Sequence, residues 1–263
     1  MQTLGIIGVG HLASYFIAGL RHVNDHRRIV LSPRNAQIAT TLARRYDCEV
    51  LEDNQAVADQ ADILLLATRP EHCLIALQAL TLHPSQLLLS VVAGVSINDL
   101  KRYAGPATVA RCLPLVTVEV GAGATPLFPN NLVARELLET IATVVAVEDE
   151  KTFELAGVAS CTSGWVFQMI AELQIWLQHA GMPPQQARII AIETFHGAAQ
   201  LAREKPDLDP QQQADTIGCD GTYTKHFIDQ FRMAQGFKAL HISGNSLLEQ
   251  LTKTAPCEVI TKD

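Results

Sequence analysis

The residues with the clearest chemical potential stand near the start of the chain, where the sequence reads Gly8-Val9-Gly10-His11-Leu12-Ala13. Gly8 permits a tight turn, and Gly10 lets a phosphate approach the backbone because it carries no side chain. The small side chain of Ala13 allows a helix to pack closely on the preceding strand. A helix that begins here offers free amides and its positive dipole end to phosphates. This spacing predicts the pyrophosphate site of a dinucleotide; the alternative is a tight turn that binds nothing.

The residues that would distinguish NADP(H) from NAD(H) follow the second apolar run, Ile29–Leu31. An NAD-binding chain usually carries Asp or Glu there, which holds the ribose 2′-hydroxyl and would repel a 2′-phosphate. This chain instead has Ser32, which can donate a hydrogen bond, and Arg34, which can pair with a phosphate in a forked geometry. The sequence therefore favours NADP(H) over NAD(H), and the alternative is that Arg34 is a solvated loop cation.

Short apolar runs alternate with helical patterns through the first 150 residues. Runs that are apolar on both faces belong to a parallel sheet covered by helices, and strand–helix alternation predicts a doubly wound α/β domain. We therefore expect a Rossmann-type dinucleotide-binding domain over residues 1–150. Its predicted strands are Leu4–Ile7, Ile29–Leu31, 62–67, 87–92 and 109–112.

The alternation of strand and helix patterns ends near residue 150, and residues 151–263 are predicted to form an all-helical domain. One helical pattern spans about 152–180 and stops at Gly181-Met182-Pro183-Pro184, and a second spans about 185–203. The stretch 166–177 is apolar on more than one face, which predicts burial on all sides. We expect a second subunit to supply part of that burial, giving a homodimer or higher homo-oligomer; the alternative is burial against the first domain.

Composition narrows the class of protein. The chain has 263 residues, a formal net charge of -7 and interspersed acids and bases, so nucleic acid is not an expected partner. No stretch reaches about 18 uninterrupted apolar residues, so no membrane span is expected. The cysteines lack metal or redox spacing, which predicts no metal site and free thiols in a reducing cytoplasm. They are Cys48, Cys73, Cys112, Cys161, Cys219 and Cys257.

Several segments, in the expected order, resemble the pyrroline-5-carboxylate reductases, which reduce a cyclic imine to proline with NAD(P)H. The resemblance implies that Asn54 contacts the adenosine ribose and that residues 67–69 lie under the nicotinamide side of the cofactor. It implies an NAD(P)H-dependent reductase of a small cyclic imine in proline biosynthesis. The resembling segments are 7–13, Asp53-Asn54, Leu66-Ala67-Thr68-Arg69-Pro70, Ser90-Val91-Val92-Ala93-Gly94-Val95-Ser96, Val120-Gly121-Ala122-Gly123-Ala124-Thr125 and, after Thr194, Gly197-Ala198-Ala199. The predicted cofactor contacts are Gly8, Gly10, His11, Leu12, Ser32, Arg34, Asn54, Ala67, Thr68, Arg69 and Ala93.

The chain departs from this family on the substrate side. Leu115 and Val116 replace a polar Asn and Thr at the junction of cofactor and substrate, and Cys161-Thr162-Ser163-Gly164-Trp165 replaces Ser-Gly-Ser-Gly-Pro. The family's carboxylate-gripping Ser-Pro-Gly-Gly-Thr-Thr becomes residues 218–223, Gly-Cys-Asp-Gly-Thr-Tyr. Asp220 in that loop would oppose a substrate carboxylate by about 1–4 kcal/mol at ~4 Å.

The hydroxyl groups of Thr222 and Tyr223 match the family's hydroxyl pair and are the predicted catalytic proton donors. The alternative is a structural one: an ordinary turn at Asp220-Gly221, followed by capping of a helix N-terminus by Thr222 or Thr224. Glu172 also matches a family residue, and we expect it to be a buried hydrogen-bond partner rather than a catalytic group. Trp165 and Trp176 are expected to anchor a core or an interface.

Other functions stay open. One is a reductase of the same architecture that acts on a different, less anionic imine or carbonyl compound. Another is a cofactor-binding homologue without catalysis that acts as a sensor or partner protein. A hydroxyacid dehydrogenase is disfavoured, because that group usually relies on a Lys in its helical half and the apolar part of the first long helix has none.

Overall fold

The computed structural model describes residues 2–253 and divides them into two compact units. The first unit holds the chain up to Ser160 and takes in the end of the last helix from Leu248. The second unit holds Cys161–Leu247. The boundary lies inside the long helix α7 (Glu150–His179), which begins where the rhythm of the sequence changes. Cys257 lies outside the described residues.

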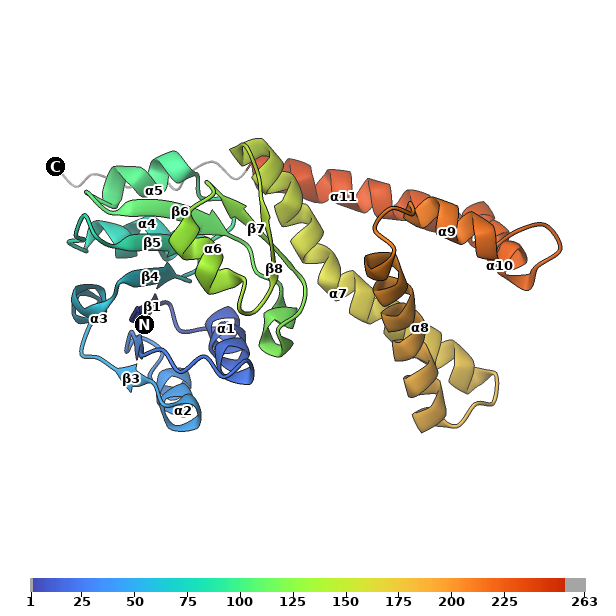
Figure 1. Ribbon diagram of the computed structural model, residues 1–263, viewed down its shortest axis with the longest axis horizontal. Coiled ribbons are helices and arrows are strands. Elements are labelled where there is room, and N and C mark those ends of the chain that lie inside the picture. The colour runs from blue at the N-terminus through green and yellow to red at the C-terminus, as the bar shows by residue number, and fades with distance from the viewer. Residues whose placement is uncertain (1, 254–263) are drawn as a thin grey trace. The chain divides into compact units, whose positions relative to one another are not determined.

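One sheet forms the centre of the first unit, with the strand order β3-β2-β1-β4-β5-β6-β7-β8 (Figure 1). The strands from β1 to β6 pair in parallel, β7 pairs antiparallel with β6, and β8 runs parallel to β7. The predicted Rossmann-type fold is confirmed. The strand bounds are β1 (Leu4–Ile7), β2 (Ile29–Leu31), β3 (Glu49–Val50), β4 (Ile63–Leu66), β5 (Leu87–Ser90), β6 (Thr108–Cys112), β7 (Ala124–Phe128) and β8 (Thr143–Ala146).

The sequence did not predict β3, β7 and β8, and the physical reasons differ. The strand predictions rest on runs that are apolar on both faces, which fits the buried inner strands. Both residues of β3 are exposed, and β8 alternates exposed with half-buried positions. β3 and β8 are the two edge strands, where burial is incomplete and the apolar signal is weak. The centre of β7 is buried, but Thr125 and Pro126 interrupt its apolar run.

Helices cover both faces of this sheet (Figure 1). Helices α1, α2 and α6 pack on one hydrophobic cluster, and α3, α4 and α5 pack on the other. Successive strand residues alternate between the clusters: Ile6 joins the first, and Ile7 joins the second. This two-sided burial explains why the inner strands are apolar throughout. The bounds are α1 (His11–His22), α2 (Ala36–Tyr46), α3 (Asn54–Gln60), α4 (Pro70–Gln78), α5 (Ile97–Tyr103), the 3-10 helix η1 (Val116–Val120) and α6 (Leu132–Leu138).

The chain reverses its direction of travel across the sheet at β1, which lies between β2 and β4. Connections leave the carboxyl ends of β1 and β4 toward opposite sides, and such a switch point opens a crevice where ligands bind. Ile7 at the end of β1 accepts a hydrogen bond from the Ala67 amide at 2.8 Å. Gly8 has φ +93°, and a Cβ added to it would lie 2.5–2.6 Å from the backbone of Ala67 and Thr68. Glycine is therefore required at position 8.

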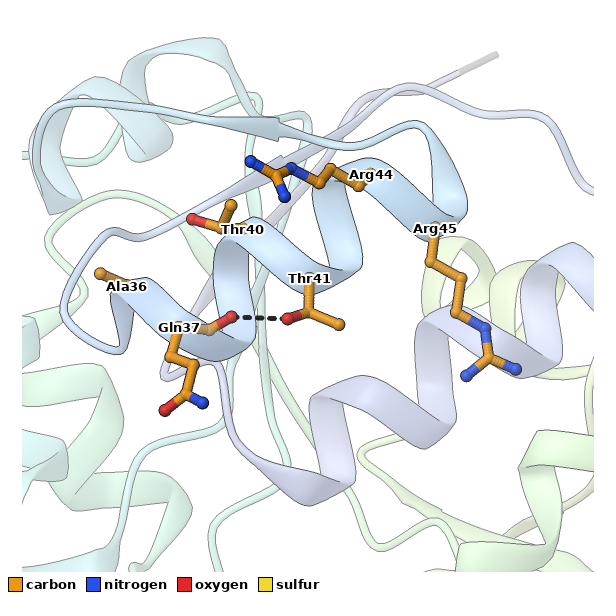
Figure 2. Close-up of a pocket in the computed structure, with 6 residues that line it drawn as sticks. All are labelled: Ala36, Gln37, Thr40, Thr41, Arg44 and Arg45. Carbon is orange, nitrogen blue, oxygen red and sulfur yellow. Dashed lines mark hydrogen bonds between the residues drawn. The ribbon is translucent and has the colours of Figure 1, made fainter.

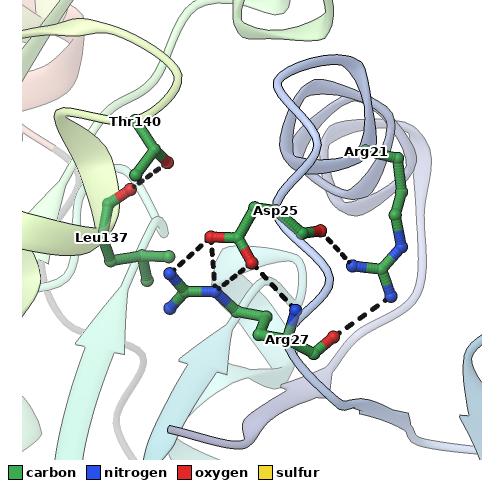
Figure 3. Close-up of polar contacts among 5 residues, drawn as sticks. All are labelled: Arg21, Asp25, Arg27, Leu137 and Thr140. Carbon is green, nitrogen blue, oxygen red and sulfur yellow. Dashed lines mark hydrogen bonds and ion pairs between the residues drawn. The ribbon is translucent and has the colours of Figure 1, made fainter. Parts of the chain in front are cut away.

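A buried ion pair fixes the connection between α1 and β2 (Figure 3). Arg27 Nη2 lies 2.6 Å from Asp25 Oδ2, and both side chains are nearly covered. Arg21 donates to the backbone carbonyl groups of both residues, at 2.6 and 3.2 Å. Burial alone would raise the pKa of Asp25, but the hydrogen bonds and charge of Arg27, with the charge of Arg21, hold it below its ordinary value. The network anchors β2, which leads directly to Ser32.

The second unit contains the rest of α7 and further helices. The predicted long helices are confirmed, and the turn between them uses Gly181 at φ +100° and a proline at the first position of α8. Within residues 161–247, all of which the structure describes, only Ala187 and Ala191 belong to the buried hydrophobic set. One chain therefore does not bury this stretch of α7 on all sides. The bounds are α8 (Pro184–Glu204), α9 (Pro210–Ile217), α10 (Tyr223–Met233) and α11 (Gly236–Lys253).

Candidate dinucleotide site

A hollow of about 470 Å³ lies at the switch point of the sheet. It gathers predicted cofactor contacts from the ends of different strands and the helices that follow them. The predicted residues that line it are Gly8, Gly10, Ser32, Arg34, Asn54, Ala67, Thr68 and Arg69. Sequence analysis missed its other lining residues, Ile7, Val9, Asn35, Ala36, His72 and Ala76. Ile7, Val9 and Asn35 adjoin a predicted residue in the chain, whereas Ala36, His72 and Ala76 come from the helices that follow.

The glycine loop has the geometry that a pyrophosphate needs. Gly10 is the N-cap residue of α1, with φ −123°, and its amide donates to the carbonyl oxygen of Gly8 at 3.1 Å. A Cβ added to Gly10 would meet no atom within 4 Å, so the space in front of this backbone is open. The first amides of a helix have no intrahelical acceptor, so those of α1 are available to an anion. The residues present fit the phosphates of a dinucleotide.

Ser32, predicted as a hydrogen-bond donor to the cofactor, lines the hollow and is tied into the glycine turn. Its side chain is buried, and its Oγ accepts a hydrogen bond from the Gly8 amide at 3.2 Å. Ser32 therefore stabilises the glycine turn, and its hydroxyl hydrogen can still be donated.

The rim of the hollow carries positive charge. Arg34 is exposed and makes none of the ion pairs found in residues 2–253, and Arg69 lies 4.0 Å from Glu71 in a weak exposed pair. Asn54 begins α3 directly after Asp53, whose carboxylate accepts a hydrogen bond from the Ala56 amide at 2.7 Å. Arg34 and Arg69 give the rim the positive charge that favours a phosphorylated ligand.

Three predicted cofactor contacts do not line this hollow. His11 is exposed at the start of α1, and the side chain of Leu12 packs against the core cluster. Ala93 follows β5, farther along the sheet. The glycine spacing marks the loop as a whole, but it does not say which side chains of the first helical turn face the ligand.

The predicted proton donors lie in the second unit, at the start of α10. Thr222 is its N-cap: the Thr222 Oγ1 accepts a hydrogen bond from the Lys225 amide at 3.1 Å and donates one to the Cys219 carbonyl at 2.7 Å. The capping interpretation of Thr222 is confirmed. The side chain of Tyr223 is 96% exposed. Asp220, in the same loop, lies 4.0 Å from the Lys225 Nζ, which partly offsets its charge.

An apolar hollow of about 540 Å³ lies within the second unit, between α7, α8, α10 and α11. Trp165 and Trp176 line it, yet both remain exposed, at 46% and 63%. They are therefore not core anchors of a single chain. Glu172 is also exposed and accepts a hydrogen bond from the Gln168 side chain at 2.8 Å, so our expectation of a buried carboxylate is wrong for one chain. The aromatic residues that line this hollow are Trp165, Trp176, Phe195, Phe227, Phe231 and Phe237.

A hollow of about 650 Å³ follows α2, but all six of its lining residues come from that one helix (Figure 2). Its drawn hydrogen bond is internal, from Thr41 Oγ1 to the Gln37 carbonyl at 2.8 Å. A site needs polar groups that converge from several elements, so we assign no function to this groove. In the described part of the chain, no cluster of three His, Cys, Asp or Glu side chains could hold a metal ion. Nor is any described helix long and apolar enough to cross a bilayer.

Two regions of the chain, one in each half of the sequence, match known protein families. Residues 3–94 match a family described as NADP oxidoreductase coenzyme F420-dependent, and residues 150–244 match one described as pyrroline-5-carboxylate reductase dimerisation. A pyrroline-5-carboxylate reductase of Pseudomonas aeruginosa is 28% identical over 250 residues, which cover 90% of this chain and 90% of that protein. One of Synechocystis is 29% identical over 232 residues, covering 84% and 86%. Both matches and these relatives make the chain similar to the pyrroline-5-carboxylate reductase family in its dinucleotide-binding and helical regions. The resemblance predicted from the sequence is confirmed.

Solved structures agree on the fold of this family. The enzyme of Streptococcus pyogenes aligns with a TM-score of 0.83 at 20% identity, covering 95% of this chain and 98% of that one. The Plasmodium falciparum pyrroline carboxylate reductase with NADP bound also has a TM-score of 0.83, at 18% identity, covering 96% and 98%. At such identities the likeness establishes the fold alone. It spans the Rossmann-type sheet and the helical region together.

Proposed function

We propose that this chain is an NADPH-dependent reductase that converts pyrroline-5-carboxylate to proline. The observation that carries the proposal is the hollow at Gly8 and Gly10, where eight residues predicted from the sequence line one open crevice at the switch point of the sheet. Similarity to pyrroline-5-carboxylate reductases over both the dinucleotide-binding and the helical regions supports the same reaction.

The preference for NADPH over NADH rests on charge at the end of β2. No carboxylate stands where an NAD-binding chain would have one, and the exposed Arg34 has no ion-pair partner in residues 2–253. A guanidinium in this position can form paired hydrogen bonds with a 2′-phosphate. The buried Ser32 fixes the turn at Gly8, which serves the pyrophosphate of either nucleotide.

The reaction needs close positioning and one proton. When bound, the reduced nicotinamide supplies the hydride to the imine carbon. The amides at the start of α1 would hold the pyrophosphate, and residues 67–69 would lie under the nicotinamide side. The imine nitrogen gains a proton, for which Tyr223 has the freer hydroxyl of the two predicted donors. Its hydroxyl is exposed, whereas the Thr222 hydroxyl already donates to the Cys219 carbonyl.

We further propose that the active form is a homodimer or larger homo-oligomer joined through the helices of the second unit. The match to a dimerisation family over residues 150–244 supports this assembly. So do the large apolar side chains that one chain leaves exposed there, among them Trp176 at 63% and Phe227 at 68%. Contiguous exposed apolar surface of this kind marks an interface in a folded protein.

A second candidate is a reductase of the same type with a less anionic imine. Asp220 favours it, because a carboxylate in this loop opposes a substrate carboxylate, and Lys225 offsets that charge only from 4.0 Å while pairing with Asp229 at 2.8 Å. Leu115 and Val116 favour it as well, since they make the junction between cofactor and substrate less polar.

The experiment is a comparison of NADPH oxidation with pyrroline-5-carboxylate and with 1-pyrroline, which lacks the carboxylate. Faster turnover of the first supports the proposal, and product analysis should then show proline. Faster turnover of the second supports the alternative, and the Asp220→Gly variant should then shift the preference toward the carboxylate. Oxidation with neither compound, while NADPH still binds, would contradict both and favour an inactive homologue.

Cofactor preference is tested separately with Arg34→Glu. The affinity for NADPH should fall by roughly 10- to 100-fold, the loss expected for charge-assisted hydrogen bonds, while the affinity for NADH changes little. Arg102→Glu, an exposed reversal on α5, is the control and should leave both affinities unchanged. Equal affinity of the Arg34 variant and the wild type for NADPH would overturn the assignment.

A further inference from the structure

A buried arginine joins the sheet to the first turns of α7. Arg111 on β6 has a fully buried side chain, and its Nη1 lies 2.5 Å from Glu150 Oε1 and 2.8 Å from Glu154 Oε1. The ring of Phe153 lies under the guanidinium, 4.5 Å from its central carbon to the ring centroid. A buried charge must be paired, so these acids define where α7 begins against β6. All of these residues belong to the first unit.

Glu150 makes a second contact that Glu154 does not share. Its Oε1 also accepts a hydrogen bond from the Ile97 amide at 2.6 Å. Ile97 is the first residue of α5, directly after Ser96, which caps that helix. The loop that ends there, residues 91–96, leaves the carboxyl end of β5 and includes Ala93, a predicted cofactor contact. One carboxylate oxygen thus ties the loop after β5 to the strand β6.

The two segments that Glu150 joins lie at the carboxyl ends of the parallel strands, which we call the reacting edge of the sheet because the proposed site lies there. Val91 donates to the Leu66 carbonyl at 3.0 Å, which places the start of the β5 loop beside Ala67 and the dinucleotide hollow. Arg111 stands one residue before the end of β6, and Leu115 and Val116 follow shortly after. Small displacements at such an edge change the alignment of donor and acceptor, and misplacement of about 1 Å can cost ~100-fold in rate.

We infer that Glu150 is a positioning residue for imine reduction: through the Ile97 amide and Arg111 it holds the loops after β5 and β6 in register at the reacting edge. The inference rests on the proposed function for its kinetic arm only. Glu154 contributes to the pairing of Arg111 and hence to stability, without holding the β5 loop.

The matched pair of variants is Glu150→Ala and Glu154→Ala, since each removes one carboxylate from Arg111 and only the first releases Ile97. At saturating imine and NADPH, Glu150→Ala should lower kcat by about tenfold or more, with the Kd for NADPH changed by less than about threefold. Glu154→Ala should keep kcat within about twofold, although its Tm falls too. Glu150→Gln retains an acceptor for the Ile97 amide and should restore most of kcat.

Amide hydrogen exchange gives a readout that does not need turnover. Glu150→Ala should speed exchange in residues 91–97, whereas Glu154→Ala should leave that segment as in the wild type. If wild-type protein reduces no imine, the proposed function fails, and this arm still decides the inference. Equal kcat losses in both variants, or unchanged exchange at 91–97 in Glu150→Ala, would overturn it. Should Glu150→Ala not fold, Glu150→Asp takes its place with the same expected and contrary outcomes, because its shorter side chain stops short of Ile97.

Discussion

The two units of this chain differ in how they bury apolar surface. Residues 2–160 form a sheet with a hydrophobic cluster on each face, and most large side chains there are covered. Residues 161–247 bury only Ala187 and Ala191, while Trp176, Phe227 and Ile217 are each more than 60% exposed. Apolar burial drives folding, so the first unit contains its own driving force. The second unit depends on a further surface, which we propose to be another copy of the chain.

The same contrast separates the two halves of the proposed reaction. The dinucleotide hollow is built from residues of the first unit alone, and its glycine loop is set by backbone contacts within that unit. The predicted proton donors stand on the exposed start of α10 in the second unit. Cofactor binding should therefore survive changes that disrupt assembly, whereas imine reduction should not.

The largest expected effect comes from charging the exposed apolar face. Phe227→Glu places a carboxylate among the aromatic side chains of the second unit, where Phe227 is 68% exposed. Burial of that charge at an interface should weaken subunit association by about 3 kcal/mol or more, roughly 100-fold. Light scattering after size exclusion should show the mass falling toward one chain. Imine reduction should fall with it, and NADPH binding should persist.

Leu132→Glu is the matched control in the first unit, since Leu132 is 72% exposed on α6. It should leave the mass unchanged. If both variants kept the wild-type mass, or if both became monomeric, the contrast between the units would fail.

A smaller effect is expected from filling the tight interior of the first unit. A Cβ added to Gly19 on α1 would collide with the backbone carbonyl of Val118 in η1. Gly19→Ala should therefore lower the free energy of unfolding by about 3 kcal/mol, the upper range for overpacking. Denaturant unfolding measures it.

Gly157→Ala, on α7, is the comparison variant, in which the added Cβ meets a movable side chain instead of backbone. Its added Cβ would lie 3.0 Å from a terminal methyl carbon of Leu113, which can move, and alanine gains up to about 1 kcal/mol of helix propensity. The net change should stay within about 1 kcal/mol. A Gly157→Ala variant less stable than Gly19→Ala would contradict this account of the packing.

An effect below that of Gly19→Ala is expected at the buried ion pair of Asp25 and Arg27. Because the folded state holds the pKa of Asp25 below its ordinary value, the stabilisation is present above the unfolded pKa of about 4 and is lost as pH falls through the lower folded value. Asp25→Asn keeps one acceptor oxygen for Arg27 and removes the charge and the second acceptor. It should cost about 1–3 kcal/mol near neutral pH.

Stability measured against pH checks this prediction, since the gap between wild type and Asp25→Asn should close on acidification. Glu49→Gln removes the carboxylate of an exposed pair with Arg28 and should change stability little. A gap for Asp25→Asn that stays constant down to acidic pH would assign the effect to packing rather than to charge.

The sequence predicts the inner strands and the glycine loop because local physics determines them. Residues 4–7 are apolar on both faces and lead into a turn that only glycine can adopt at position 8. The long helices are also predictable from the sequence, because Gly181 and the prolines that follow it end one helical pattern and begin the next. These signals need no knowledge of distant contacts.

Other features depend on contacts far apart in the chain, so periodicity could not reveal them. The exposed β3 and β8 have weak apolar patterns, and the pairing of β7 against β6 has no local signal. The hydroxyl of Ser32 can donate a hydrogen bond to a phosphate. In the structure its oxygen also accepts one from the amide of Gly8, which is 24 residues away. Glu172 is exposed in one chain. An apolar pattern indicates that a helix is covered, but it does not say whether the same chain or another one covers it.

The central claim is that the open backbone at Gly10 binds the phosphates of a nicotinamide dinucleotide, and calorimetric titration of Gly10→Ala with NADPH tests it most directly. Position 10 has an ordinary extended φ and no neighbour within 4 Å of an added Cβ, so the variant should fold with nearly the wild-type Tm. Its methyl group would stand where the pyrophosphate approaches, and the Kd for NADPH should rise by roughly 30-fold, about 2 kcal/mol. A folded variant that binds NADPH within about twofold of the wild type would contradict the account.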